Sequence, residues 1–174
     1  MQHILQFFIF FLLIVLAPQS YSDEVPITIK SSEIADYDFV PLINDRNIRV
    51  NVYDSSKGCP DINKRKKGFV GREKLTKAKP QRSVDVASDG EVFLTITNFW
   101  RNPAGTKRTC FSALAFTPDQ SGYTLDVGLV THHACPDAVL SGADGSPATY
   151  RKLAVKKPFL GLMGGGKVSD GYCD

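Results

Sequence analysis

The sequence predicts a mainly β protein: a single-domain antiparallel β-sandwich, immunoglobulin-like or closed as a partly open barrel, with two disulfides and little helix. Three observations predict it. Apolar and polar residues alternate along several short segments, clusters of Pro, Gly, Asp and Ser separate these segments, and four cysteines follow an apolar leader. Short alternating segments bounded by turn residues are typical of sandwiches and small barrels.

The N-terminus resembles an export signal. Residues 4–17 are almost wholly apolar, which is the length of a signal-peptide core and is short for a bilayer span of about 20 residues. Small residues follow, and cleavage after Ser22 would leave Ser20 and Ser22 at the positions that the peptidase reads. We therefore expect a signal peptide at 1–22 and one domain at 23–174. No Lys or Arg precedes the core, so an uncleaved membrane anchor is the alternative.

Cys59, Cys110, Cys135 and Cys173 are an even set in an exported chain, which predicts two disulfides with three possible connectivities. We favour Cys59–Cys110 with Cys135–Cys173, because the second bond would fasten the Gly-rich C-terminal segment. The expected location is periplasmic or secreted. The chain after residue 22 has no Asn-x-Ser/Thr glycosylation acceptor, which favours a bacterial periplasm.

The clearest strand patterns are "VFLTITNFW" (92–100), "CFSALAF" (110–116) and "YTLDVGLV" (123–130), in each of which apolar residues recur with a period of two. Between the last two lies "TPDQSG" (117–122), whose Pro, Asp and Gly predict a hairpin turn.

Weaker strand patterns end at turn residues such as "DSSKG" and "ASDG"; they are 27–29, 47–53, 84–86 and 150–155. Helical signal is sparse. The segment "GREKLTKA" (71–78) predicts two helical turns before Pro80, and "SSEIADY" (31–37) predicts one.

The heptad "THHACPD" (131–137) contains three metal-ligand residue types. Adjacent residues on an extended chain point to opposite faces, so His132 and His133 cannot both face one ion without a bulge or turn. His133 and Cys135 could share a face, but a metal site needs at least a third ligand. His132 and His133 are also the only histidines after residue 22, so no distant imidazole completes a site. We expect Cys135 in a structural disulfide and no bound metal.

Enzyme signatures are missing. "GLMGGGK" (161–167) has the spacing of a phosphate-binding loop, but Val168 stands where a hydroxyl should hold magnesium and too few residues follow for the helix. The sequence has no G-x-S-x-G elbow and no H-E-x-x-H helix. We expect no catalysis and no cofactor. A small hydrolase using His132 or His133 with scattered partners is the alternative.

Residues 57–82 hold ten basic and two acidic residues, a local charge of +8 in a chain of net charge +3, so the remainder carries about −5. The densest run is Lys64, Arg65, Lys66 and Lys67, with Arg72 farther along. This segment is either a solvated loop or a surface for an acidic protein, anionic lipid or a cell-wall polymer. Nucleic acid is not expected, because an exported protein meets little of it.

"NFWRNP" (98–103) places Phe99 and Trp100 on opposite faces of a strand, with Arg101 next, so one of the two aromatic side chains can lie at the surface. A sole Trp is most often a core residue, and we expect Trp100 in the core. An exposed Trp100 would favour binding of a sugar or a protein.

Together these features predict an exported, non-catalytic binding protein that recognises a protein partner, such as an inhibitor or immunity-type protein. The alternative is an envelope-associated accessory module that makes peripheral contact with anionic lipid or cell wall through 57–82. The candidate binding residues are Lys64, Arg65, Lys66, Lys67, Arg72, Trp100 and Arg101.

Overall fold

The structure of the chain is a computed structural model. It describes residues 24–31, 34, 46–56, 58–101, 107–129, 135, 137–156, 167–169 and 172–173. Within these ranges it leaves out the side chains of residues 46, 100, 101, 107 and 108. The expected signal peptide at 1–22 lies outside the described residues, and no helix within them could span a lipid bilayer.

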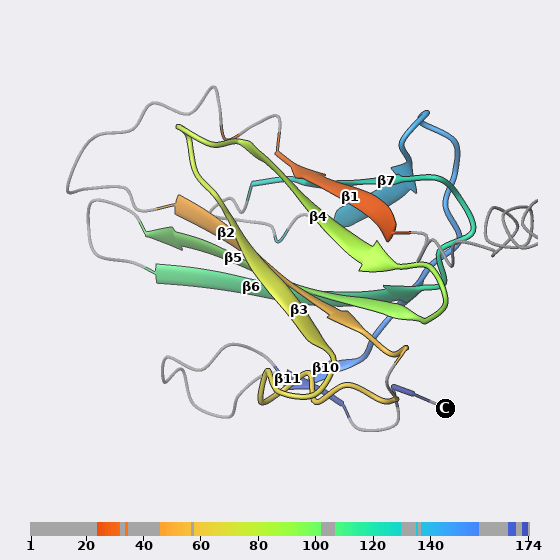
Figure 1. Cartoon of the computed structure of the whole chain (residues 1–174). Coiled ribbons are helices and arrows are strands. Elements are labelled where there is room, and N and C mark those ends of the chain that lie inside the picture. Colours follow the sequence, from red (N-terminus) through yellow and green to blue (C-terminus); the bar gives the residue numbers. More distant parts are fainter. Residues whose placement is uncertain are drawn as a thin grey trace, which may run out of the picture.

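Two β-sheets pack face to face, as predicted (Figure 1). Sheet A has the order β4 (Gln81–Ala87), β1 (Glu24–Lys30), β7 (Tyr123–Val127), β8 (Ala138–Gly142). Sheet B has the order β3 (Phe69–Leu75), β2 (Arg46–Asp54), β5 (Val92–Arg101), β6 (Lys107–Phe116), β9 (Arg151–Lys152). A short antiparallel pair, β10 (Val155–Lys156) and β11 (Lys167–Val168), forms a separate two-stranded sheet.

The strands are antiparallel to their neighbours except for β1 and β7, which run parallel. The predicted antiparallel β-sandwich is thus confirmed, with one parallel pair within it. The parallel pair arises because the chain leaves sheet A after β4 and re-enters it beside β1 rather than beside β4.

The core between the sheets follows from the alternation in the sequence. Val50 on β2 and Leu94 on β5 project from sheet B, and Ile27 and Leu125 project from sheet A; all four are fully buried. Each fully buried aliphatic side chain contributes about 1.5–3 kcal/mol relative to an exposed one. The clear patterns at 92–100, 110–116 and 123–130 correspond to β5, β6 and β7, although β7 ends at Val127.

The predicted hairpin at 117–122 is wrong. β6 belongs to sheet B and β7 to sheet A, so the turn carries the chain across the sandwich. Tyr123 stabilises the crossing: its hydroxyl donates to a carboxylate oxygen of Asp119 at 2.5 Å, and its ring lies 4.6 Å from that of Phe116. The misassignment has a physical cause, since both strands face one core and their alternation does not say to which sheet each belongs.

The predicted helix at 71–78 is also wrong, because residues 69–75 form strand β3, which pairs with β2. Thr76 and Lys79 then close a tight turn into β4 through two backbone hydrogen bonds of 3.1 and 2.9 Å. Sheet pairing here overrides the helix propensity of Glu, Lys and Leu. Of the predicted turn at 31–37, only Ser31 and Ile34 are described, and both are buried.

The weaker strands are confirmed in β1, β2 and β4, and residues 150–155 are confirmed in part as β9 and the start of β10. The two expected disulfides exist, but the favoured pairing is wrong: the bonds are Cys59–Cys173 and Cys110–Cys135. Tyr172 and Cys173 lie on the outer face of sheet B, beside Cys59, which no sequence spacing reveals. Two disulfides indicate an oxidising, extracytoplasmic environment.

Candidate binding surface

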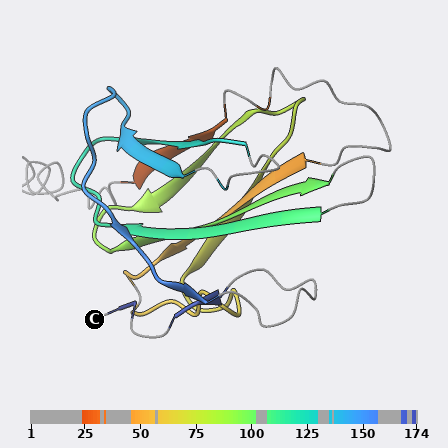
Figure 2. The same cartoon turned by 180° about the vertical axis from the view of Figure 1, so that it is seen from behind.

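A second apolar cluster lies on the outer face of sheet B, away from the core between the sheets. It consists of Tyr53, Ile62, Phe93, Ala113, Ala115, Leu153 and Val168, with Phe111, Val155 and Tyr172 against it. Two segments cover it: residues 58–68, which we call the basic loop, and the described residues 151–156, 167–169 and 172–173, which we call the C-terminal cover. The two lie side by side on this face in both views (Figures 1 and 2).

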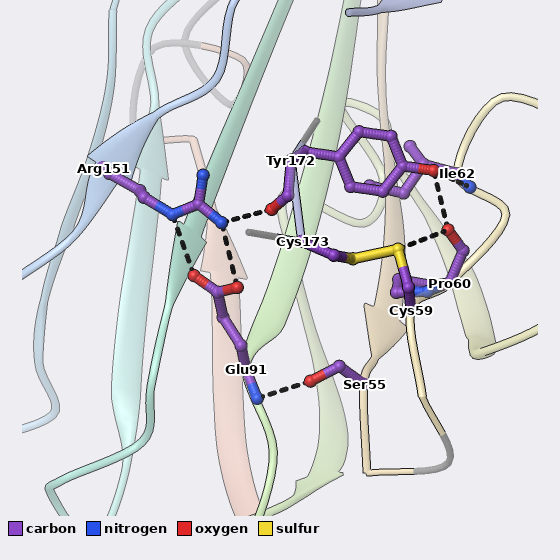
Figure 3. Close-up of a disulfide and its surroundings, with 8 residues drawn as sticks. All are labelled: Ser55, Cys59, Pro60, Ile62, Glu91, Arg151, Tyr172 and Cys173. Atoms are coloured by element: carbon purple, nitrogen blue, oxygen red, sulfur yellow. Dashed lines mark hydrogen bonds and ion pairs between the residues drawn. A yellow bond between two sulfur atoms is a disulfide. The ribbon is translucent and has the colours of Figure 1, made fainter. Parts of the chain in front are cut away.

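The basic loop is fastened to this cluster through its own backbone. The Tyr53 hydroxyl, on β2, donates to the carbonyl oxygen of Ile62 at 2.9 Å. The Tyr172 hydroxyl donates to the carbonyl oxygen of Pro60 at 2.7 Å, next to the Cys59–Cys173 disulfide (Figure 3). Burial raises the pKa of the Tyr53 hydroxyl above its ordinary value, so this donor keeps its proton at neutral pH.

Asn63 forms a two-way clamp between the basic loop and β11. Its side-chain amide donates to the carbonyl oxygen of Val168 at 3.0 Å, and its side-chain oxygen accepts from the Val168 amide at 3.0 Å. Because one side chain satisfies both backbone groups of Val168, the loop and the C-terminal cover are held in one register.

Arg151 holds the C-terminal cover against sheet B. Its guanidinium donates to both carboxylate oxygens of Glu91, at 3.0 and 2.9 Å, and also to the carbonyl oxygen of Tyr172 (Figure 3). The Glu91 amide in turn donates to the Ser55 hydroxyl at 2.8 Å. Two parallel hydrogen bonds between a guanidinium and a carboxylate require one relative orientation of the two groups. This contact therefore fixes the C-terminal cover beside Ser55, close to the start of the basic loop.

The exit of the basic loop is tightly constrained. The Asp54 amide donates to the Gly68 carbonyl at 2.8 Å, and Gly68 has a φ of 72°. A Cβ at this position would lie 2.5 Å from the Asp54 oxygen and 2.6 Å from the Pro60 Cβ. Only glycine accepts both the left-handed backbone and this approach.

Four basic side chains project from this fastened frame. Lys64, Arg65, Lys66 and Lys67 are all exposed. Among the described residues, an acidic side chain lies within 4 Å of only one of these four, Lys64, whose ammonium is 3.7 Å from the Asp61 carboxylate. Phe69 and Val70 follow directly and leave 37% and 42% of their surface exposed. The sequence-predicted cationic run is thus assembled on an ordered support, with apolar side chains beside it.

The cationic surface continues along β3. Arg72 is exposed, and its Nε donates to the side-chain oxygen of Asn51 at 2.8 Å. Lys74 lies opposite Arg49 in the β2–β3 ladder, and both are exposed. Arg49 had no sequence signal, because its place on this surface depends on the pairing of β2 with β3.

The only acidic residue of β3 does not neutralise this surface. Adjacent residues of a strand face opposite sides, so Glu73 points away from Arg72 and Lys74. Its carboxylate pairs instead with Arg82 of β4, at 3.8 Å.

The remaining candidate residues are less informative. Trp100 and Arg101 end β5 and pair through their backbones with β6, while their side chains lie outside the described part. His132 and His133 also lie outside it, and Cys135 is in a disulfide as predicted. Among described residues, no group of three His, Cys, Asp or Glu side chains is placed to hold a metal ion.

One hollow of about 170 Å³ lies beside β6, and its walls include Phe111, Ala113, Leu153 and Val155. Lys152 and Asp137 also line it and pair at 3.0 Å. The hydrogen bond from Lys152 to Asp137 raises the pKa of the lysine. Small-molecule sites typically enclose about 300–1,000 Å³, so this hollow accommodates little more than a side chain.

Comparisons with known proteins found no relative of this chain: it matches no protein-family model, no curated protein and no solved structure.

Proposed function

We propose that this chain is an exported, periplasmic or secreted, non-catalytic binding protein that recognises an acidic protein partner, as an inhibitor or immunity-type protein would. The single observation that carries the proposal is the fastening of the basic loop. Four adjacent cationic side chains are exposed on a loop whose backbone is fixed by Tyr53, Asn63, Tyr172 and a disulfide.

The fastening matters because a preformed surface loses little conformational entropy when it binds, whereas a free loop must be ordered first. Exposed cations on a fixed support also steer an acidic partner during encounter.

A second candidate function is peripheral contact with an anionic envelope surface. The exposed Phe69 and Val70 beside the basic loop favour it, since apolar side chains flanked by cations suit the boundary of an anionic bilayer.

The test compares two double variants of equal charge change. Lys66→Gln with Lys67→Gln removes two cations from the basic loop, and Lys30→Gln with Lys79→Gln removes two exposed or half-buried cations outside both the basic loop and the C-terminal cover. Binding of a fluorescently labelled oligoglutamate peptide and of phosphatidylglycerol vesicles is measured at low and physiological salt.

Exposed ion pairs are worth up to about 1 kcal/mol each, so the loop variant should bind the peptide about tenfold more weakly. The peptide affinity of the loop variant should also depend less on salt concentration than that of the wild type. The control variant should match the wild type in both affinity and salt dependence. Equal loss in both variants would refute a role for the basic loop. Strong binding to vesicles with none to the peptide would select the envelope function.

A further inference from the structure

We propose that the outer face of sheet B carries a preformed carboxylate-binding site, formed by Arg49, Arg72 and Lys74, which takes acidic side chains of the protein partner. This inference rests on the proposed function, because it specifies a second set of contacts on the same cationic surface.

The three cationic side chains lie on one face of the sheet. Ile48 and Val50 of β2 are buried in the core between the sheets, so Arg49, which lies between them, points to the outer face. Lys74 is directly opposite Arg49 in the β2–β3 ladder, and Arg72 lies two residues before Lys74 on the same face. All three are exposed, so a partner can reach them without a rearrangement of the sheet.

The facing pair of Arg49 and Lys74 is unfavourable for the chain alone. In an antiparallel pair, the Cβ atoms of directly opposite residues are about 5 Å apart, and like charges there are destabilising. In the part of the chain that the structure describes, neither side chain forms an ion pair. Glu73, the nearest acidic residue along β3, pairs with Arg82 instead. A local conflict of this kind, kept without a compensating contact, is characteristic of a functional site.

Arg72 is oriented by a chain of hydrogen bonds that ends inside the sheet. Its Nε donates to the side-chain oxygen of Asn51 at 2.8 Å, and the Asn51 side-chain amide donates to the Thr95 hydroxyl at 2.9 Å. Thr95 is only 2% exposed, so the chain is anchored at a buried point. With Nε occupied, the guanidinium keeps the N–H donors of its two terminal nitrogens, and this planar fork matches the two oxygens of a carboxylate.

The surroundings of the site favour a protein partner over a membrane. Its neighbours on the outer face include Asn51 and also Thr97, which lies directly opposite Arg49 in the β2–β5 ladder. These side chains are polar, whereas contact with the boundary of a bilayer relies on apolar ones. A second copy of this chain that used the same face would bring three more cations and would be repelled. An acidic segment of a protein supplies the opposite charges.

The experiment measures the affinity of a fluorescently labelled oligoglutamate peptide for the chain from residue 23 onward, by fluorescence anisotropy at low and physiological salt. The face variant, Arg49→Gln/Lys74→Gln, removes the two facing cations. The fork variant, Arg72→Lys, keeps the charge but removes the planar fork. The basic-loop and control double variants described above are measured alongside, and thermal unfolding gives the melting temperature of every variant.

We expect the face variant to bind the peptide about tenfold more weakly than the wild type, since two exposed charge contacts are lost. Its melting temperature should be about 1–2 °C higher, because the like-charge pair is removed. The fork variant should bind about threefold more weakly with an unchanged salt dependence, because its charge is kept. The control variant should bind as the wild type does.

Unchanged affinity in the face and fork variants, with weaker binding in the basic-loop variant, would overturn this inference and leave the proposed function intact. A melting temperature of the face variant several degrees below that of the wild type would also overturn it, because the cations would then serve the fold. Binding to phosphatidylglycerol vesicles with none to the peptide would overturn it in favour of a membrane surface. If the wild type binds neither, both this inference and the proposed function fall.

Discussion

The Tyr172 hydroxyl donates a hydrogen bond to the carbonyl oxygen of Pro60 at 2.7 Å. Pro60 directly follows Cys59 in the chain and Tyr172 directly precedes Cys173, and these two cysteines form a disulfide. One hydrogen bond and one covalent bond therefore join the same two segments across more than a hundred residues of chain. Through this junction the C-terminal cover fixes the loop that carries the four cations.

The two disulfides should differ in their contribution to the free energy of unfolding. Cys59 and Cys173 are 114 residues apart, and Cys110 and Cys135 are 25 apart. Closing the longer loop removes more entropy from the unfolded chain, by about 1.3 kcal/mol in the chain-entropy relation. Denaturant unfolding of the paired Cys→Ser variants should show the larger loss, about 2–4 kcal/mol or more, for Cys59/Cys173. A larger loss for Cys110/Cys135 would contradict this ranking.

Two glycines of the basic segment provide a matched test of the loop's exit. Gly68→Ala should destabilise the protein by about 2–4 kcal/mol, because it adds left-handed backbone strain and a steric clash. Gly71→Ala should change stability little, since a Cβ there meets nothing within 4 Å. Thermal unfolding of the two variants measures the difference, and similar values for both would contradict the described geometry of the loop exit.

Stability should fall in alkaline solution because of Tyr53. Burial raises its pKa above the ordinary value of 10.0, so the folded state holds this proton more tightly than the unfolded state. The resulting stabilisation is complete below about pH 10 and is lost as the pH rises through the folded-state pKa. Burial also raises the pKa of Tyr123, which adds to the same decline.

The variant Tyr53→Phe separates the contribution of Tyr53 to this alkaline decline from that of Tyr123. Its free energy of unfolding at neutral pH should be about 1 kcal/mol lower than that of the wild type, because the Ile62 carbonyl loses its hydrogen-bond donor. Its melting temperature should then decline less steeply than that of the wild type above pH 10. An unchanged alkaline decline would show that Tyr53 does not titrate as described.

Replacement of Arg151 by lysine should weaken the attachment of the C-terminal cover. A lysine at this position could not bond both Glu91 oxygens and the Tyr172 carbonyl at once, because an ammonium lacks the planar fork of a guanidinium. We expect Arg151→Lys to cost about 1 kcal/mol of stability in denaturant unfolding, since the contact is partly exposed. Lys156→Arg, on a neighbouring exposed strand, serves as the control; equal effects would contradict a specific role for Arg151.

The sequence predicted the sandwich and most of its strands because burial on one face imposes an alternation that needs no tertiary information. It did not predict to which sheet a strand belongs. The turn at 117–122 suits a crossing between sheets as well as a hairpin, and β6 and β7 alternate identically in both cases. The helix expected at 71–78 failed for a related reason: β3 is an exposed edge, where charged residues are common and blur the strand pattern.

The candidate surface was predictable only in part. A run of charge is visible in any sequence, so Lys64 to Lys67 and Arg72 were found. The residues that fasten the basic loop, among them Asn63, Arg151 and Tyr172, lie up to 112 residues from their partners. The disulfide pairing was mispredicted for the same reason, because four cysteines permit three pairings and spacing alone does not select one.

The central claim is that the C-terminal cover holds the basic loop in a preformed, binding-competent arrangement. The most direct test is the affinity of a labelled acidic peptide for the wild type and for the Cys59→Ser/Cys173→Ser variant, at a temperature where both remain folded. The account predicts that the variant still unfolds cooperatively but binds about tenfold more weakly, since its loop must be ordered during binding. Equal affinity in the two proteins would contradict it.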